Sequence, residues 1–338
     1  MNIAHAISKI TSGSGLKENE MAEVMLDLLE GRTTDAQIGA FLIALNMKGE
    51  SVEEVLGAAK IMRQLSSKVE VNKERLVDTC GTGGVGIGIF NVSTTAAFVA
   101  CACGARVAKH GNRSATRKSG SADLLEAAGV CLELEPSQVA ECIDNVGLGF
   151  MFAPGHHSAM KHVIGPRKEI AHKSIFNILG PLTNPASPPN QVMGVYDKKW
   201  MKPVAEVHKS LGSNNVMVVH SEDNLDEISI ASKTKVVELR EDKISEYIIS
   251  PEEFGFELHS LDELKVNSPE ESLSMAKKAL TGEHSGASSM VALNAGAALY
   301  VSGVENSLAE GIDRAKEGIK QKKGLDKLQE LSEYSQSF

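Results

Sequence analysis

The feature that most constrains the fold is a change of pattern about 70 residues into the chain. Residues 1–68 carry only helical signals, with apolar residues at helical spacing and a Ser51-x-x-Glu54 capping box. From residue 74 onward, short apolar runs alternate with helical patterns, which is typical of parallel βα units. We therefore expect a small all-helical domain followed by an α/β domain with a mostly parallel central sheet.

After the α/β domain begins, the chain is predicted to return once to the helical domain. The stretch IFNILGPLTNP, from Ile175 to Pro185, is a helical pattern that Gly180-Pro181 and Asn184-Pro185 should stop, and we interpret it as a crossing between domains. Residues 1–68 with about 168–190 are expected to form the helical domain. Residues 69–167 and 191–338 are expected to form the α/β domain.

Composition limits the class of protein. The 338 residues are 42% hydrophobic, enough for a sizeable core, and the formal charge of −9 disfavours a nucleic-acid or anionic-membrane surface. Five cysteines without C-x-x-C spacing indicate reduced thiols in a cytoplasmic protein rather than a zinc site. No signal-peptide pattern is visible, and the most apolar helical stretch, 96–105, is about half the ~20 residues that span a bilayer.

The stretch GTGGVGIGIFNVST, from Gly81 to Thr94, is too rich in glycine for a helix or strand. A flexible connector, a dinucleotide-binding turn and a phosphate cradle are all open. It fits G-x-G-x-x-G, but no helix begins at the third glycine and Arg106 stands where an acid is expected. Backbone N–H groups of such a loop, next to a helix that begins near Ser93, favour a phosphate or pyrophosphate cradle.

A second loop, VAKHGNRSATRKSGSAD, supports the phosphate cradle. It follows the next predicted strand and gathers five basic side chains among Gly, Ser and Asn: Lys109, His110, Arg113, Arg117 and Lys118. A run of charge is usually a solvated face. This one lies between a strand and a helix, where parallel sheets bind ligands at strand carboxyl ends.

Acidic residues follow a later strand, in HSEDNLDEISI. The cluster is either an acidic surface turn or, with a polyphosphate nearby, a Mg²⁺ site, since Mg²⁺ prefers one or two carboxylates with phosphate oxygens and water. It comprises Glu222, Asp223, Asp226 and Glu227. The histidines of HHSAMKH (His156, His157 and His162) lack metalloprotease spacing, so packing or surface roles are expected for them.

Taken together, these stretches resemble the anthranilate phosphoribosyltransferase family over essentially the whole chain. Their order is GTGG…FNVST, VAKHGNRS…SGSAD, FMFAPGHHSAMKHVIGPRKE, IFNILGPLTNP, DNLDEIS and VALNAGAALYVSG. The resemblance implies a nucleoside phosphorylase-like fold, with homodimers formed through the helical domain. It implies transfer of phosphoribosyl from phosphoribosyl pyrophosphate (PRPP) to the amine of anthranilate, with release of pyrophosphate, in tryptophan biosynthesis.

The resemblance also implies site residues. Against PRPP it places Gly81, Gly83, Gly84, Asn91, Val92, Ser93, Thr94, Lys109, His110, Gly111, Asn112, Arg113, Ser114 and Ser121. Against anthranilate it places Gly81, Asn112 and Arg167, and Arg167 suits a carboxylate because a guanidinium can bind both oxygens. Two Mg²⁺ ions per monomer are implied, with Ser93, Asp226 and Glu227 as ligands. No residue is implied as a certain catalytic base, so electrostatic stabilisation of the leaving group should dominate.

The sequence departs from the family pattern near PRPP. Val85 replaces an Asp, Ile89 replaces a Ser or Thr, and Thr116 and Arg117 stand where two serines are usual. Two alternatives stay open at this point. One is a pyrimidine nucleoside phosphorylase, whose second loop differs from KHGNRS. The other is a non-catalytic nucleic-acid-binding paralogue, which should be basic and should lose the acidic metal ligands.

Overall fold

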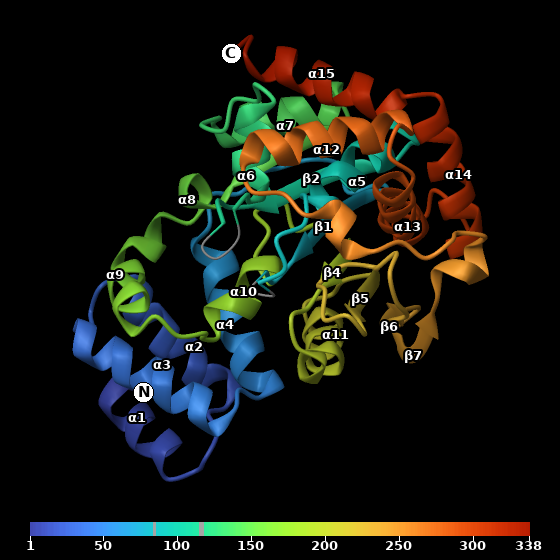
Figure 1. Ribbon diagram of the computed structural model, residues 1–338. Coiled ribbons are helices and arrows are strands. Elements are labelled where there is room, and N and C mark those ends of the chain that lie inside the picture. The colour runs from blue at the N-terminus through green and yellow to red at the C-terminus, as the bar shows by residue number, and fades with distance from the viewer. Residues whose placement is uncertain (84–85, 115–117) are drawn as a thin grey trace.

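The computed structural model describes residues 1–83, 86–114 and 118–338. The predictions for Gly84, Val85, Thr116 and Arg117 therefore lie outside the described residues. Figure 1 shows the N-terminal helices grouped at one end and the sheet with its covering helices at the other. The prediction of a helical part joined to a larger α/β part is confirmed.

Four helices make up the N-terminal part: α1 (Ile3–Thr11), α2 (Glu18–Leu29), α3 (Asp35–Lys48) and α4 (Val52–Leu65). Their ends follow from local chemistry. The Thr34 hydroxyl accepts a hydrogen bond from the N–H of Gln37, and Ser51 and Glu54 form the predicted capping box. No strand interrupts these helices, as the sequence pattern predicts.

The central sheet has seven strands in the order β3-β2-β1-β4-β5-β6-β7. They are β1 (Leu76–Gly81), β2 (Arg106–Gly111), β3 (Leu148–Phe152), β4 (Asn190–Gly194), β5 (Asn215–Ser221), β6 (Thr234–Arg240) and β7 (Lys243–Ile249). The first five are parallel, and β6 and β7 are antiparallel additions at one edge. The chain runs outward from β1 through β2 and β3, then returns to the other side of β1 as β4. Such a reversal opens a crevice beyond the carboxyl ends of the two strands.

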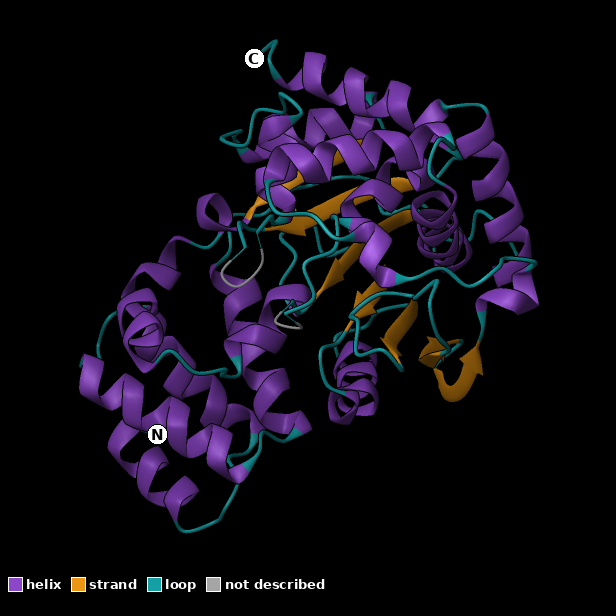
Figure 2. Cartoon of the chain, in the orientation of Figure 1, coloured by secondary structure: helices purple, strands orange, loops and turns teal. Residues whose placement is uncertain are grey.

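Helices cover both faces of the sheet (Figure 2). Those that pack directly on strands are α5 (Val92–Ala102), α7 (Pro136–Asn145), α11 (Met201–Ser210) and α13 (Ser285–Val301). Four more pack on other helices: α12 (Pro269–Thr281) and α14 (Leu308–Lys320) lie on α5 and α13, α15 (Lys323–Ser335) lies on α5, and α6 (Ser121–Ala127) lies on α12. Alternate residues of β5 face opposite sides. Met217 and Val219 join the core under α5 and α13, while Val216 and Val218 join the core shared by α11 and the N-terminal helices. None of the described helices has the length and apolar character needed to cross a membrane.

Three helices connect the two parts: α8 (Ala153–His156), α9 (Lys161–Ile170) and α10 (Phe176–Leu182). α9 packs on α2 and α3, and α10 packs on α4. α10 continues through Gly180 and Pro181 and ends at Leu182, between the two pairs that the sequence predicts will stop it, Gly180-Pro181 and Asn184-Pro185. A proline in the last turn removes only one N–H, and the helix ends directly after it at Leu182. The division of the chain at 168–190 stays a prediction.

A buried polar network lies inside the sheet, directly below the carboxyl ends of β1, β2 and β4. The Asp78 carboxylate has no exposed surface and accepts hydrogen bonds from the side chains of Asn184 (2.9 Å) and Gln191 (3.1 Å). Lys109 is 1% exposed, and its ammonium donates to the carbonyl of Thr79. Burial raises the pKa of Asp78 and lowers that of Lys109, while the attraction between the two charges opposes both shifts.

We expect Lys109→Met to lower the free energy of unfolding by about 3 kcal/mol, because Asp78 loses its nearby positive charge and the Thr79 carbonyl loses its donor. Urea unfolding measures the change. The matched control is Lys60→Met, which removes a surface ion pair with Glu18 and should cost less than about 1 kcal/mol. Equal effects of the two substitutions would contradict a stabilising role for the buried network.

Candidate functional site

Two adjoining cavities lie beyond the carboxyl ends of β1, β2 and β4. One is polar, with a volume of about 300 Å³, and the other is more apolar, with a volume of about 480 Å³. Seven residues line both: Cys80, Gly81, Thr82, His110, Gly111, Asn112 and Asn177. The site therefore occupies the crevice predicted from the strand order, and the two cavities share part of their lining.

The polar cavity contains most of the residues predicted to bind PRPP or metal. Those lining it are Gly81, Gly83, Asn91, Ser93, His110, Gly111, Asn112, Arg113, Ser114, Ser121, Asp226 and Glu227. Of the predicted residues that the structure describes, three do not line it: Val92, Thr94 and Lys109 are each 1% exposed and belong to the layer behind the cavity. The Thr94 hydroxyl has no hydrogen-bond partner among the described residues. Sequence reasoning missed six lining residues: Cys80, Thr82, Ser119, Gly120, Lys173 and Asn177.

The loop that carries Asp226 lies directly on the ends of β1 and β4. Gly81 and Gly194 pair across the two strands, and a Cβ at either position would collide with Asp226. The absence of side chains at both positions lets the Asp226 carboxylate reach the glycine loop, where it accepts a hydrogen bond from the N–H of Gly83 at 2.8 Å. The next residue, Glu227, accepts from the N–H of Ser93 at 3.2 Å, in the first turn of α5.

These acidic residues fit a magnesium site. Asp226 is 3% exposed and Glu227 8% exposed, and both line the polar cavity together with Ser93. Two carboxylates and a hydroxyl are oxygen donors of the kind Mg²⁺ prefers, and the cavity leaves room for phosphate oxygens and water. Among the described residues no group of three or more His, Cys, Asp or Glu side chains is placed to hold a metal, so a bound substrate would have to supply the remaining ligands.

Asn91 joins the two predicted phosphate loops at the start of α5. Its amide oxygen accepts hydrogen bonds from Ser119 and Ser272, each at 2.7 Å, and its amide nitrogen donates to the Ser119 carbonyl at 3.2 Å. Ser272 comes from α12, far along the chain, and is completely buried. The Asn91 side chain is therefore held in place, and it fixes the end of the glycine loop against the end of the second loop.

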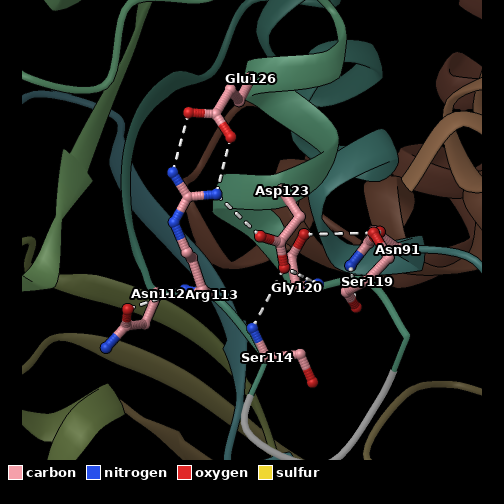
Figure 3. A network of polar contacts seen from close by, with 8 residues as sticks. All are labelled: Asn91, Asn112, Arg113, Ser114, Ser119, Gly120, Asp123 and Glu126. Carbon is pink, nitrogen blue, oxygen red and sulfur yellow. Dashed lines mark hydrogen bonds and ion pairs between the residues drawn. The ribbon is translucent and has the colours of Figure 1, made fainter. Parts of the chain in front are cut away.

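The second loop leaves β2 at Gly111 and enters α6 at Ser121. Figure 3 shows that its Arg113 side chain extends along α6 to Asp123 and Glu126. The guanidinium of Arg113 therefore contacts carboxylates of the protein, and Arg113 is also one of the residues that line the polar cavity.

The apolar cavity lies between the sheet and the connecting helices. It is lined by Met62, Ala153, Pro154, His157, Ser158, Met160, Lys161, Ile164, Arg167, Phe176, Gly180, Pro181 and Thr183, besides the shared residues. Its one predicted side chain from α9 is Arg167, whose guanidinium lies 4.9 Å from the centre of the Phe176 ring. Burial lowers the pKa of Arg167, and no carboxylate among the described residues pairs with it. A planar, anionic ligand would satisfy this cation.

Two neighbouring histidines line the apolar cavity, and one of them, His110, also lines the polar cavity. The ring centres of His110 and His157 are 5.1 Å apart, and neither Nε2 has a hydrogen-bond partner in the described part of the chain. Burial lowers the pKa of His110 to about 3 and that of His157 to about 4, so both rings are neutral at pH 7. His157 lies in the quoted GHHSAMKH stretch, where the spacing gave no sign that it would face a cavity.

The buried histidines make stability depend on pH. A third buried histidine, His208, also has a lowered pKa, of about 3. All three histidines, including His110 and His157, therefore have pKa values below the ~6.5 of an unfolded chain. Below that pH the unfolded state binds more protons than the folded state does. We expect the free energy of unfolding to fall as the pH drops from about 6.5 toward 5, by up to ~1.4 kcal/mol per pH unit for each histidine. Urea unfolding at a series of pH values measures this free energy and its slope against pH. His208→Asn, which can keep the hydrogen bond to Ser213, should show a smaller slope than the wild type, and an identical slope would contradict this account.

Comparison with known proteins agrees with this geometry. Residues 73–325 match the glycosyl transferase family a/b domain and residues 4–66 match the helical bundle domain of the same family. The chain is 54% identical to an anthranilate phosphoribosyltransferase of Marinomonas sp. (strain MWYL1), with all of this chain and 98% of the relative covered.

Solved structures give the same result. The crystal structure of anthranilate phosphoribosyltransferase from Thermus thermophilus superposes with a TM-score of 0.93 at 40% identity, covering 98% of this chain and 99% of that one. The enzyme from Saccharomyces cerevisiae in complex with PRPP and Mg superposes with a TM-score of 0.90 at 27% identity, covering 99% and 98%.

Proposed function

The chain belongs to the anthranilate phosphoribosyltransferase family, and from that premise we propose that its two adjoining cavities separate the two substrates. The enzyme transfers the phosphoribosyl group of PRPP to the amine of anthranilate and releases pyrophosphate, a step of tryptophan biosynthesis. The pyrimidine nucleoside phosphorylase and the nucleic-acid-binding paralogue receive no support from the relatives. One observation supports separate binding of the two substrates: a polar cavity and a more apolar cavity lie side by side and share lining residues.

PRPP is assigned to the polar cavity. Backbone N–H groups of the glycine loop and of the first turn of α5, together with the hydroxyls of Ser93 and Ser121, suit phosphate oxygens. We propose the full set implied by the sequence, including Gly84 from outside the described residues and Val92, Thr94 and Lys109 from the layer behind. The charge of Lys109 would act there through the strand ends rather than by contact.

Magnesium is assigned to Ser93, Asp226 and Glu227, and we propose two ions per monomer. The S. cerevisiae enzyme was solved with PRPP and Mg, which supports Mg²⁺ as the metal. The chemistry that the metal supplies is neutralisation of the charge on the leaving pyrophosphate. Asp226 and Glu227 lie on the side of the cavity formed by the glycine loop and α5, where that charge would collect.

Anthranilate is assigned to the apolar cavity. Arg167 would bind its carboxylate, and Asn112 and Gly81, which line both cavities, would lie next to the amine and the ribose carbon that it attacks. The aromatic amine is neutral and already nucleophilic at pH 7, so no strong base is required. The apolar walls exclude water, which protects the ribose cation that develops as the bond to pyrophosphate breaks.

We also propose that the enzyme is a cytoplasmic homodimer formed through its helical part. Two large apolar side chains are exposed there on neighbouring helices, Met47 on α3 at 82% and Ile164 on α9 at 43%. Sedimentation equilibrium of the purified chain measures the oligomeric state directly.

Turnover is tested by mixing the protein with PRPP, Mg²⁺ and anthranilate and following the loss of anthranilate fluorescence. The reaction should require all three components and release one pyrophosphate for each anthranilate consumed. Phosphorolysis of uridine or thymidine, or salt-sensitive DNA binding without turnover, would contradict the proposed function.

We expect Arg167→Ala to raise the KM for anthranilate roughly ten- to a hundredfold, with little change in the KM for PRPP. A lost charged hydrogen bond costs about 1.5–3 kcal/mol, and only the apolar cavity contains this side chain. Steady-state kinetics measure both constants. Lys168→Ala, an exposed neighbour on the same helix, is the control. Equal losses for both substrates in Arg167→Ala would refute the assignment.

We expect the double variant Asp226→Asn/Glu227→Gln to lose turnover by roughly a hundredfold or more while keeping its fold. The amide oxygens can still accept from Gly83 and Ser93, but they bind a cation weakly. Circular dichroism and a Mg²⁺ titration at fixed PRPP measure the outcome. Glu222→Gln, exposed on the same segment, should behave like the wild type. Near-normal activity of the double variant at ordinary Mg²⁺ would rule out the metal role.

A further inference from the structure

One carboxylate holds both ends of the second loop. Asp123, in the first turn of α6, accepts hydrogen bonds from the N–H of Ser114 at 3.2 Å and from the N–H of Gly120 at 2.7 Å. Both donors reach the same oxygen, and Figure 3 shows them converging on it. Asp123 lies behind the loop rather than among the residues that line the polar cavity.

The two ends of the loop touch at Gly120. A Cβ at this position would collide with the backbone of Ser114 and lie 2.8 Å from the carbonyl oxygen of Asn112. The same carbonyl accepts a hydrogen bond from the N–H of Ala122 at 3.3 Å. The loop is therefore closed at its base by close backbone contact, and Asp123 is the side chain that fastens this contact.

Arg113 adds ion pairs that connect the loop to the surface of α6. Its guanidinium donates to Asp123 at 3.0 Å and to both carboxylate oxygens of Glu126 at 2.7 and 2.8 Å. The aspartate and the glutamate are three residues apart and share one face of the helix, so a single guanidinium spans both. Arg113 holds the pKa of Glu126 below its usual range. The bidentate pair with Glu126 and the contact with Asp123 form a network of charges around Arg113. Such a network orders exposed side chains better than an isolated surface ion pair does.

We propose that Arg113, Asp123 and Glu126 form a brace that positions the second loop for PRPP, and that Arg113 acts on PRPP through this loop rather than by contacting it. The inference rests on the proposed function and deepens it, because it changes the role of one residue in the predicted PRPP set. Asp123 and Glu126 are positioning residues in this account. In the described part of the loop, backbone N–H groups and the hydroxyls of Ser114, Ser119 and Ser121 then make the phosphate contacts.

The two possible roles of Arg113, a brace and a direct contact with PRPP, predict opposite changes in PRPP affinity when Glu126 is removed. Removing Glu126 deletes a negative charge close to an anionic substrate and releases Arg113. If Arg113 binds PRPP directly, the affinity for PRPP should stay the same or increase. If Arg113 acts as a brace, the loop loses an anchor and the affinity should decrease. The same reasoning applies to Asp123→Asn, which loses charge and keeps only one acceptor oxygen.

The test is the dissociation constant for PRPP with saturating Mg²⁺, measured by titration calorimetry. We expect Glu126→Ala to weaken binding roughly three- to tenfold and Asp123→Asn to weaken it by about tenfold or more, with the KM for anthranilate within about twofold of wild type. Arg113→Gln combined with Glu126→Ala should bind no more weakly than Arg113→Gln alone. The control is Glu141→Ala, exposed on α7. Unchanged or tighter binding by Glu126→Ala would overturn the brace.

A second readout does not depend on PRPP. Amide hydrogen exchange at Ser114 and Gly120, followed by NMR, should be roughly tenfold faster or more in Asp123→Asn, while amides in the middle of α5 should not change. Unchanged exchange at both amides would overturn the inference. Failure of the proposed function would instead show as wild-type protein that neither binds PRPP nor consumes anthranilate.

Discussion

The geometry of the site depends on one buried carboxylate. Asp78 lies in the middle of β1 and accepts hydrogen bonds from Asn184, which follows α10, from Gln191 in β4, and at 3.4 Å from the backbone N–H of His110 in β2. A charge in the sheet interior is costly unless it is paired and hydrogen-bonded, and here three segments must meet around it to satisfy it. These are the segments whose ends form the crevice. The same network therefore stabilises the sheet and sets the spacing of the two cavities.

The crevice itself follows from strand order and small residues. Because β4 returns beside β1, the carboxyl ends of the two strands lie side by side. Gly81 and Gly194 let the Asp226 loop close over these ends, which brings two acidic side chains to the positive end of α5. Negative charge so close to a phosphate-binding surface is unfavourable unless a cation intervenes. The proposed binding of PRPP at this surface should therefore depend on Mg²⁺.

The sequence predicts the fold because helical patterns alone fill residues 1–68 and alternating strand and helix patterns fill the rest. It predicts the candidate binding loops because glycine and basic residues directly follow predicted strands. It does not predict which side chains face the cavity. Lys109 looks like a phosphate ligand in KHGNRS, yet it is buried and its ammonium donates to the backbone carbonyl of Thr79 in the neighbouring strand. Asp123 and Glu126 look like ordinary helix-surface acids until the loop folds back and brings Arg113 to them. His157 shows no signal because a cavity wall is made by tertiary packing and not by local spacing.

The central claim is that the substrates occupy separate cavities and meet at their common wall. The most direct measurement is a crystal structure with PRPP, Mg²⁺ and benzoate, which resembles anthranilate without its amine. The account predicts pyrophosphate against the first turn of α5, the benzoate carboxylate on Arg167, and the ribose between them beside Gly81 and Asn112. A benzoate ring inside the polar cavity, or PRPP phosphates in the neighbouring groove lined by Lys198 and Lys235, would contradict it.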